Sequence, residues 1–192
     1  NGQMVGEYPN GYTGFCYDIT PYVTFGSDNP NVIVVKVMNM APSGRWYTGS
    51  GIVNPVNLIV TDKTFFLRHG ITYKTLDLEN TYKNDGSAVL DVKADIYSDA
   101  SNGVAYIKTT VYDADGKVAA EPVSSQIVDY NPSTKLTFNT SVTVPNVHLW
   151  SCDDPYLYTI RTELYTMING GDGEFHLSDY METRYGFRWF EF

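Results

Sequence analysis

The order of apolar and polar positions along the chain predicts β structure almost throughout. In residues 89–97, apolar side chains at the even positions alternate with charged side chains at positions 91, 93 and 95. Residues 136–144 and 158–164 alternate in a similar way. Period-two alternation is typical of a strand with one buried face and one face in water. We therefore expect these segments to be strands of antiparallel sheets.

Turn-forming residues separate these strands. Residues 113–116 read Asp-Ala-Asp-Gly after a strand expected over 104–112, and residues 169–173 read Asn-Gly-Gly-Asp-Gly before a last strand that ends near Phe187. Such residues favour tight turns. About seven strands are expected beyond residue 65, a number and spacing typical of an immunoglobulin-like β-sandwich. No helix longer than one or two turns is expected.

The first part of the chain is expected to hold about four further strands. Residues 31–37 read NVIVVKV, an almost continuous apolar run that predicts a strand buried on both faces, and residues 56–61 predict another. A jelly roll needs about eight strands, so residues 1–62 resemble half of one. We expect a partial jelly roll over 1–62, followed by a β-sandwich domain over 63–192. The fold class is all-β.

Composition and charge narrow the class of function. Hydrophobic residues make up 43% of the chain, which is enough for packed cores and argues against disorder. The net charge of −9 argues against nucleic-acid binding, since phosphate contacts need clustered Lys and Arg. No basic run or long apolar run indicates a membrane partner.

Cysteine and histidine do not indicate a metal or disulfide site. Cys16 and Cys152 lie far apart, and we expect both to be free thiols. His69, His148 and His176 are scattered without the spacing that metal ligands show. No metal and no cofactor are expected.

Four blocks together carry a family resemblance. Residues 10–21 read NGYTGFCYDITP and residues 45–52 read RWYTGSGI. Further along, residues 148–158 read HLWSCDDPYLY and residues 184–192 read RYGFRWFEF. In this order the first two resemble the sugar-binding domain of glycoside hydrolase family 2, which holds β-galactosidases, β-glucuronidases and β-mannosidases. The last two are similar to the L-W-S-P-D-x-P-x-L-Y and G-F-R stretches of that family's sandwich domain.

The resemblance implies a non-catalytic role for this chain. In the family, a jelly-roll sugar-binding domain precedes an immunoglobulin-like sandwich, and a barrel with the catalytic glutamates follows. The chain resembles the end of the first domain and the whole of the second. It is therefore expected to be a scaffold fragment of a retaining, β-galactosidase-like enzyme, with the parent's catalytic barrel as its partner. No catalytic residue is expected within it.

The resemblance also points to candidates for the substrate rim, namely Arg45, Trp46 and Tyr47. In relatives the loop that enters this block helps to shape the sugar site. An acidic residue often precedes the tryptophan there, whereas this chain has Ser43 and Gly44. Trp46 could stack on a sugar ring, but core or interdomain packing is the favoured interpretation.

Other conspicuous residues are interpreted as structural. Tyr12 and Phe15 are expected in the jelly-roll core, and Trp150 and Tyr158 in the sandwich core. The pair Asp153-Asp154 is interpreted as a turn before a proline.

Two further pairs of charged or aromatic residues are interpreted from their places on the expected strands. Glu163 and Glu182 lie on strand patterns and are expected to be solvated. Arg188 and Trp189 are expected either to anchor the sandwich to the barrel or to form an exposed patch.

Two alternatives stay open from the sequence. The chain could be a stand-alone carbohydrate-binding or adhesive β-sandwich module. The half jelly roll could also self-associate through exposed strand edges.

Overall fold

The computed structural model describes residues 1–26, 30–39 and 49–190. The chain divides into two compact units, Asn1–Asn57 and Leu58–Phe192.

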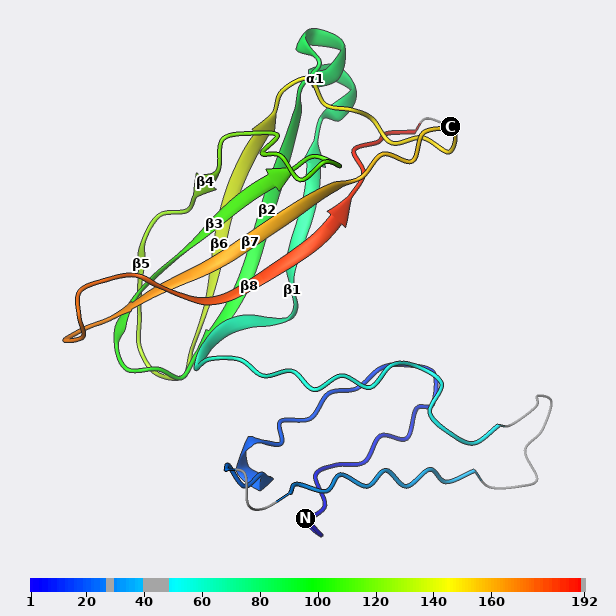
Figure 1. Ribbon diagram of the computed structural model, residues 1–192, viewed down its shortest axis with the longest axis vertical. Helices are drawn as coiled ribbons and strands as arrows, with labels where there is room; N and C mark the ends of the chain where they lie inside the picture. Colours follow the sequence, from blue (N-terminus) through cyan, green and yellow to red (C-terminus); the bar gives the residue numbers. More distant parts are fainter. Residues whose placement is uncertain (27–29, 40–48, 191–192) are drawn as a thin grey trace. The chain divides into compact units, whose positions relative to one another are not determined.

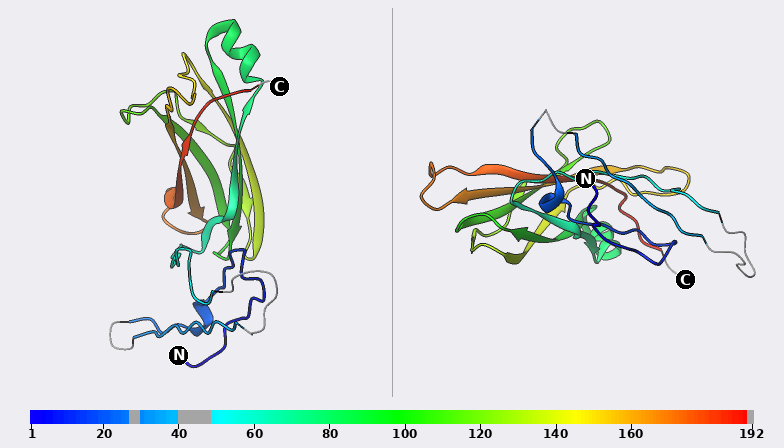
Figure 2. Two further views of the ribbon diagram at one scale, coloured as in Figure 1. Left: turned by 90° about the vertical axis from the view of Figure 1, so that its right-hand side faces the viewer. Right: turned by 90° about the horizontal axis from the view of Figure 1, so that it is seen from below.

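The second unit is a β-sandwich of two antiparallel sheets, seen as two layers in Figure 2 (left). One sheet has the order β1-β2-β6, with the strands β1 (Thr64–Leu76), β2 (Ala88–Ser98) and β6 (Thr134–Val144). The other has the order β4-β3-β7-β8, with β5 also paired to β3 (Figure 1). Its strands are β3 (Gly103–Tyr112), β4 (Val123–Ser124), β5 (Val128–Tyr130), β7 (Tyr158–Ile168) and β8 (His176–Tyr185). The strands expected at 89–97, 104–112, 136–144 and 158–164 are thereby confirmed.

The buried faces follow the alternation of the sequence. On β2, Leu90, Val92, Ala94 and Ile96 are each fully buried, as their even spacing predicts. The facing strands β3 and β7, and β6 beside β2 in the same sheet, contribute further apolar side chains to the interior. Burial of these side chains is the main favourable term that holds the two sheets together.

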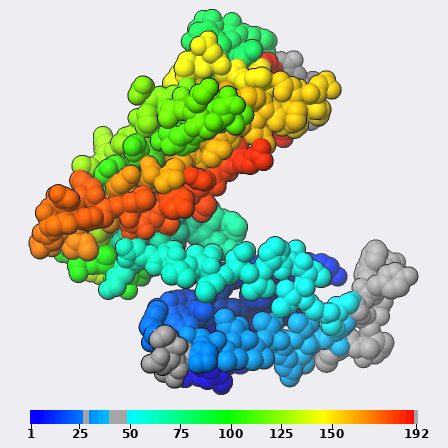
Figure 3. Space-filling model, viewed as in Figure 1, coloured from blue at the N-terminus to red at the C-terminus, as the bar shows by residue number. Residues whose placement is uncertain are grey.

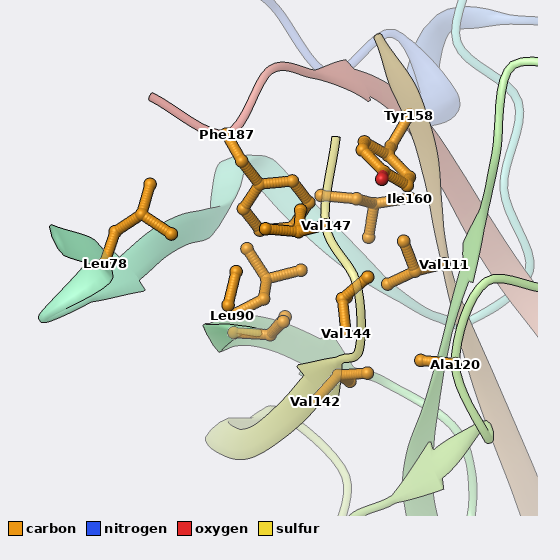
Figure 4. Close-up of a cluster of buried hydrophobic side chains, with 12 residues drawn as sticks. Leu78, Leu90, Val111, Ala120, Val142, Val144, Val147, Tyr158, Ile160 and Phe187 are labelled. Atoms are coloured by element: carbon orange, nitrogen blue, oxygen red, sulfur yellow. The ribbon is translucent and has the colours of Figure 1, made fainter. Parts of the chain in front are cut away.

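A layer of threonines lies between two apolar clusters. One cluster, drawn in Figure 4, includes Val111, Val142 and Ile160, and the other includes Ile107 and Leu164. On each of β3, β6 and β7, a buried threonine separates a residue of one cluster from a residue of the other. These threonines are Thr109, Thr140 and Thr162.

The threonine hydroxyls are hydrogen-bonded inside the sandwich. Thr109 Oγ1 and Thr140 Oγ1 are 3.3 Å apart, and Thr162 Oγ1 lies 3.0 Å from the hydroxyl oxygen of Tyr73. A buried hydroxyl is tolerated when it has a partner, and costs free energy when it has none. The layer therefore constrains how the two sheets align without leaving these groups unsatisfied.

The open side between β1 and β8 is closed by side chains. The Phe66 N–H donates to Asp179 Oδ2 at 2.9 Å, and Ser178 Oγ donates to the Thr64 carbonyl at 2.7 Å. Both contacts lie beside register shifts, one in β1 after Phe66 and one between β7 and β8. The unpaired backbone groups of an edge strand are a template for aggregation, and these side chains occupy part of that edge.

A short helix connects β1 to β2. Helix α1 (Leu78–Asp85) buries Leu78 and ends at Gly86, whose φ of 75° is the left-handed conformation that favours glycine at a helix end. The Gly86 N–H donates to the Tyr82 carbonyl at 2.9 Å. Among the described residues, no helix has the length and apolar character needed to cross a bilayer.

The first unit has little regular structure in its described residues. A 3₁₀ turn, η1 (Thr20–Tyr22), follows Asp18, whose carboxylate accepts the Thr20 N–H. The side chain of Asn31 accepts the Thr24 N–H and donates to the Thr24 carbonyl, each at 2.9 Å. Local side-chain bonds of this kind hold turns rather than sheets.

Two expectations for the first 62 residues are wrong. Residues 31–37 and 56–61 form no β ladder, and their apolar side chains are exposed rather than buried. Tyr12 and Phe15 are also exposed, although Phe15 lies between the rings of Tyr8 and Tyr17. An apolar run becomes a buried strand only where neighbouring strands bond its backbone and a second layer covers its side chains. The described residues of 1–62 supply neither.

The sandwich core predicts a sharp contrast between two isoleucines. Ile107→Ala removes a fully buried side chain and should lower the free energy of unfolding by about 2–5 kcal/mol. Ile127→Ala, at a side chain that is 59% exposed, should change it by less than about 0.5 kcal/mol. Urea denaturation of both variants measures the difference. Equal losses would contradict this description of the core.

Candidate functional site

The substrate-rim candidates Arg45, Trp46 and Tyr47 lie outside the described residues. Their role stays a prediction. Among the described residues, the family resemblance is carried by 10–21, 49–52, 148–158 and 184–190. The last two of these segments belong to the sandwich.

These two segments, far apart in the sequence, meet at one end of the sandwich. The Trp150 N–H donates to the Phe187 carbonyl at 2.8 Å. The Trp150 side chain lies directly against Gly186, where an added Cβ would come within 2.9 Å of Trp150 Cβ and 3.0 Å of Cγ and Cδ1. Any larger residue at position 186 would therefore collide with the indole. We call this contact between Trp150 and residues 186–188 the tryptophan clasp.

Phe187 anchors the clasp in the core. Its side chain is fully buried and makes edge-to-face contacts with Tyr158 at 5.1 Å and Tyr185 at 5.2 Å between ring centroids. Figure 4 shows the Phe187 ring beside Val147 and Ile160. Aromatic pairs in this geometry add stability beyond the area that they bury. The end of β8 is thus fixed to the interior.

Arg188 and Trp189 extend the clasp toward the surface. The Arg188 guanidinium lies over the Trp150 ring, 4.9 Å from its centroid, and its side chain is exposed. Trp189 is half-buried, and its ring lies 5.7 Å from that of Tyr82 on α1. The two residues expected to form an anchor or a patch are therefore held in place by aromatic neighbours. Trp150 itself is half-buried and is not part of the sandwich core, so its expected place there is wrong, whereas Tyr158 is buried in the core as expected.

A second cluster orders the turn before β7. The His148 ring stacks on Tyr156 with centroids 4.1 Å apart, and its Nε2 lies 2.6 Å from Asp154 Oδ2. Ser151 Oγ accepts the Asp154 N–H at 3.0 Å. Ser151, His148 and Asp154 lie together, but the serine bonds the Asp154 backbone and not the imidazole. The cluster therefore builds a turn, as interpreted for Asp153-Asp154, and not a nucleophile–base pair.

Tyr158 links this turn to the core. Its hydroxyl accepts the His148 N–H at 2.8 Å. Burial raises the pKa of Tyr158, and the bond from His148 partly offsets that effect. The neutral hydroxyl is therefore the form that the folded protein favours.

Glu163 of β7 and Glu182 of β8 are engaged by one arginine. Arg161 Nε donates to Glu163 Oε1 and Nη1 donates to Glu182 Oε1, each at 3.0 Å. Burial is the largest influence on the pKa of Arg161 and lowers it, but the bonds and charges of the two glutamates outweigh burial, and the pKa is raised. The Glu163 side chain is largely covered, so its expected solvation is wrong, whereas Glu182 is exposed as expected. Arg161 can cover Glu163 because both side chains lie on the outer face of the second sheet.

Both cysteines are free thiols and exposed, as expected. Within the described ranges, no group of three or more His, Cys, Asp or Glu side chains is placed to hold a metal ion.

Comparison with known proteins decides the family. The model of glycosyl hydrolases family 2 matches residues 73–188, which is more than half of the chain and includes Trp150 and Arg188. The chain belongs to glycosyl hydrolase family 2.

Relatives of this family 2 chain include two annotated glycosidases. It is 34% identical to the β-galactosidase BoGH2A of Bacteroides ovatus, over 85% of the chain and 18% of that protein. It is 35% identical to a putative β-glucuronidase of Formosa agariphila, over 98% of the chain and 16% of that protein. The family 2 chain thus spans less than a fifth of the length of these two relatives.

Solved structures agree with this assignment. A β-glycosidase from Bacteroides vulgatus superposes with a TM-score of 0.66 at 28% identity, covering 98% of this chain and 21% of that chain. A family 2 member from Bacteroides cellulosilyticus superposes with a TM-score of 0.69 at 25% identity, over 88% of this chain and 21% of that chain. The family 2 chain is therefore homologous to a non-catalytic portion of these glycosidases.

The clasp predicts that position 186 tolerates only glycine. Gly186→Ala should lower the free energy of unfolding by about 1–3 kcal/mol, because the new methyl group forces the Trp150 indole out of contact. Gly11→Ala is the control, since an added Cβ at Gly11 meets nothing within 4 Å. Thermal denaturation compares the two, and an unperturbed Gly186→Ala protein would contradict the contact.

Proposed function

We propose that this chain is a non-catalytic scaffold within a family 2 glycoside hydrolase that cleaves terminal β-linked sugars. Its task is to present the residues after β8 in a fixed direction, so that a catalytic domain beyond them is held and oriented. The observation that carries this proposal is the tryptophan clasp. It ties the segment 184–190 to the core through Phe187 and to the surface through Arg188.

The strand order supports the finer assignment of the second unit. One sheet contains the first, second and sixth strands, and the other contains the third, seventh and eighth. This order supports an immunoglobulin-like sandwich, in which two sheets share Greek-key connections. We assign residues 63–192 to this class on that basis.

The first unit fits part of a jelly roll that is completed by other segments of the enzyme. Its apolar run at 31–37 is exposed, with Val34 at 84%, and so is the run at 56–61, which extends past the end of this unit at Asn57, with Val60 at 83%. Exposed aliphatic runs of this kind mark surfaces that become covered. A sugar-binding domain in the parent would cover them and pair their backbone groups.

The chemistry belongs to the parent enzyme. A retaining glycosidase needs two free carboxyl groups about 5–5.5 Å apart around the scissile bond. Glu163 and Glu182 instead share the single guanidinium of Arg161, which engages one oxygen of each. We therefore assign hydrolysis to carboxylates outside this chain. The similarity to BoGH2A favours a β-galactoside as the substrate.

The stand-alone carbohydrate-binding or adhesive module is the second candidate. It is less favoured because the curated relatives described above are glycosidases several times longer than this chain.

Grafting the chain into a relative tests the scaffold role. The homologous segment of BoGH2A is replaced with this chain, and hydrolysis of nitrophenyl β-galactoside and nitrophenyl β-glucuronide is measured. We expect the chimaera to keep the sugar preference of BoGH2A, because the reacting groups lie outside the exchanged segment.

The control is the isolated 192-residue chain, which should release no nitrophenol from either substrate. A folded chimaera with a changed sugar preference, or hydrolysis by the purified isolated chain, would contradict the proposal.

A further inference from the structure

We propose that the outer face of the second sheet carries a subsite for a neutral saccharide. This site goes beyond the scaffold role, which does not require it. A depression of about 300 Å³ lies on this face beside the loop that follows β3. It is lined by residues of β3, β7, β8 and that loop, namely Tyr112, Asp113, Ala114, Thr159, Arg161 and Glu182. The outer surfaces of β7 and β8 are turned toward the viewer in Figure 3.

The floor of the depression is held rigid by paired charges. Arg161 bonds Glu182 at 3.0 Å across the two strands, in the register that places these residues directly opposite. The guanidinium also lies over the ring of Tyr180, 4.4 Å from its centroid. Contacts on three sides fix the Arg161 side chain, so little rotamer entropy remains to be lost when a ligand binds.

The wall of the depression is a tightly bonded turn. Asp113 Oδ1 accepts the N–H groups of Asp115 at 2.9 Å and Lys117 at 2.8 Å. The Ala114 N–H donates to the Tyr156 hydroxyl at 3.1 Å, which ties the turn to the segment before β7. A wall built in this way keeps its shape without a ligand, and pre-formed sites of this kind bind with a smaller ordering cost.

The lining matches the chemistry of sugar hydroxyl groups. A hydroxyl both donates and accepts, so it is best satisfied where donors and acceptors alternate. Arg161 supplies donors, Asp113 and Glu182 supply acceptors, and Thr159 supplies a group of each kind. Tyr112 is half-buried and adds an aromatic surface at the rim. The volume lies at the lower end of the range of about 300–1,000 Å³ that small-ligand sites occupy.

Charge selects a neutral sugar over an acidic one. The lining holds two carboxylates and one guanidinium, and that guanidinium is already paired with Glu182 and Glu163. No surplus positive charge among these lining residues is left to attract a carboxylate ligand. Arg184 lies opposite Thr159 in the register and is the nearest further cation along β8. An acidic sugar would have to bind through cations outside the lining, such as Arg184 and Lys117.

Nuclear magnetic resonance titration of the whole chain tests the site, with lactose as the neutral probe and glucuronate as the acidic probe. Lactose should shift the backbone amides of residues 112–117, 159–161 and 182 in a saturable manner, and glucuronate should leave them unchanged. Glu182→Gln should weaken lactose binding about tenfold, because a charge-assisted acceptor is lost.

Two further variants keep the test decisive. Thr159→Val should weaken lactose binding about fivefold without changing any charge. Glu174→Gln, a charge change on the exposed loop before β8, should leave it unaltered. Lactose without saturable shifts in this region, equal binding of glucuronate, or lactose affinity unchanged by both Glu182→Gln and Thr159→Val would overturn the proposal. None of these outcomes bears on the chimaera, whose activity depends on the clasp.

Discussion

The direction in which the chain leaves β8 depends on one close approach, that of the Trp150 side chain to the backbone at Gly186. The absence of a side chain at Gly186 lets the Trp150 side chain lie against the backbone just after β8, where the Trp150 N–H donates to the Phe187 carbonyl. With the backbone held there, Phe187 points into the core and Arg188 points outward over the indole. One steric constraint thus fixes an interior residue and a surface residue together.

The threonine layer and the clasp act at different places in the sandwich. Thr109, Thr140 and Thr162 lie between the two apolar clusters and restrict how the sheets slide past one another. Buried polar pairs are satisfied in only one alignment, so they select it over others. The clasp then fixes the last strand within that alignment. Together they give the rigidity that the proposed scaffold role requires.

The sequence predicts the sandwich well because period two is a local signal. Leu90, Val92 and Ile96 are buried where the alternation places them, and β2, β3 and β6 lie within a residue or two of their expected ranges. β7 begins where expected, at Tyr158, but continues four residues beyond the expected end, to Ile168. The threonine layer was not predicted, since threonine fits both faces of a strand. The coverage of Glu163 by Arg161 was not predicted either. The alternation along a strand predicts which face of the sheet a side chain lies on, but not which side chains surround it there.

Other features depend on contacts that no local pattern contains. The apolar run at 31–37 has the sequence of a buried strand, but burial requires partners that the described residues of 1–62 do not provide. The meeting of Trp150 with Gly186 joins segments far apart in the chain. The family resemblance pointed to the segments 148–158 and 184–192 separately, and the structure shows that residues of the two segments contact each other. The rim candidates at 45–47 stay predictions.

The clasp is tested most directly by nuclear Overhauser effects from the Trp150 indole. The account predicts strong cross-peaks from Trp150 Hδ1 to the Gly186 α-protons, and ring-current shifts of those protons. It also predicts cross-peaks from the indole to the Arg188 side chain. A folded chain whose Trp150 indole shows no cross-peak to Gly186 would contradict the account, because residues 184–190 would then have no fixed direction.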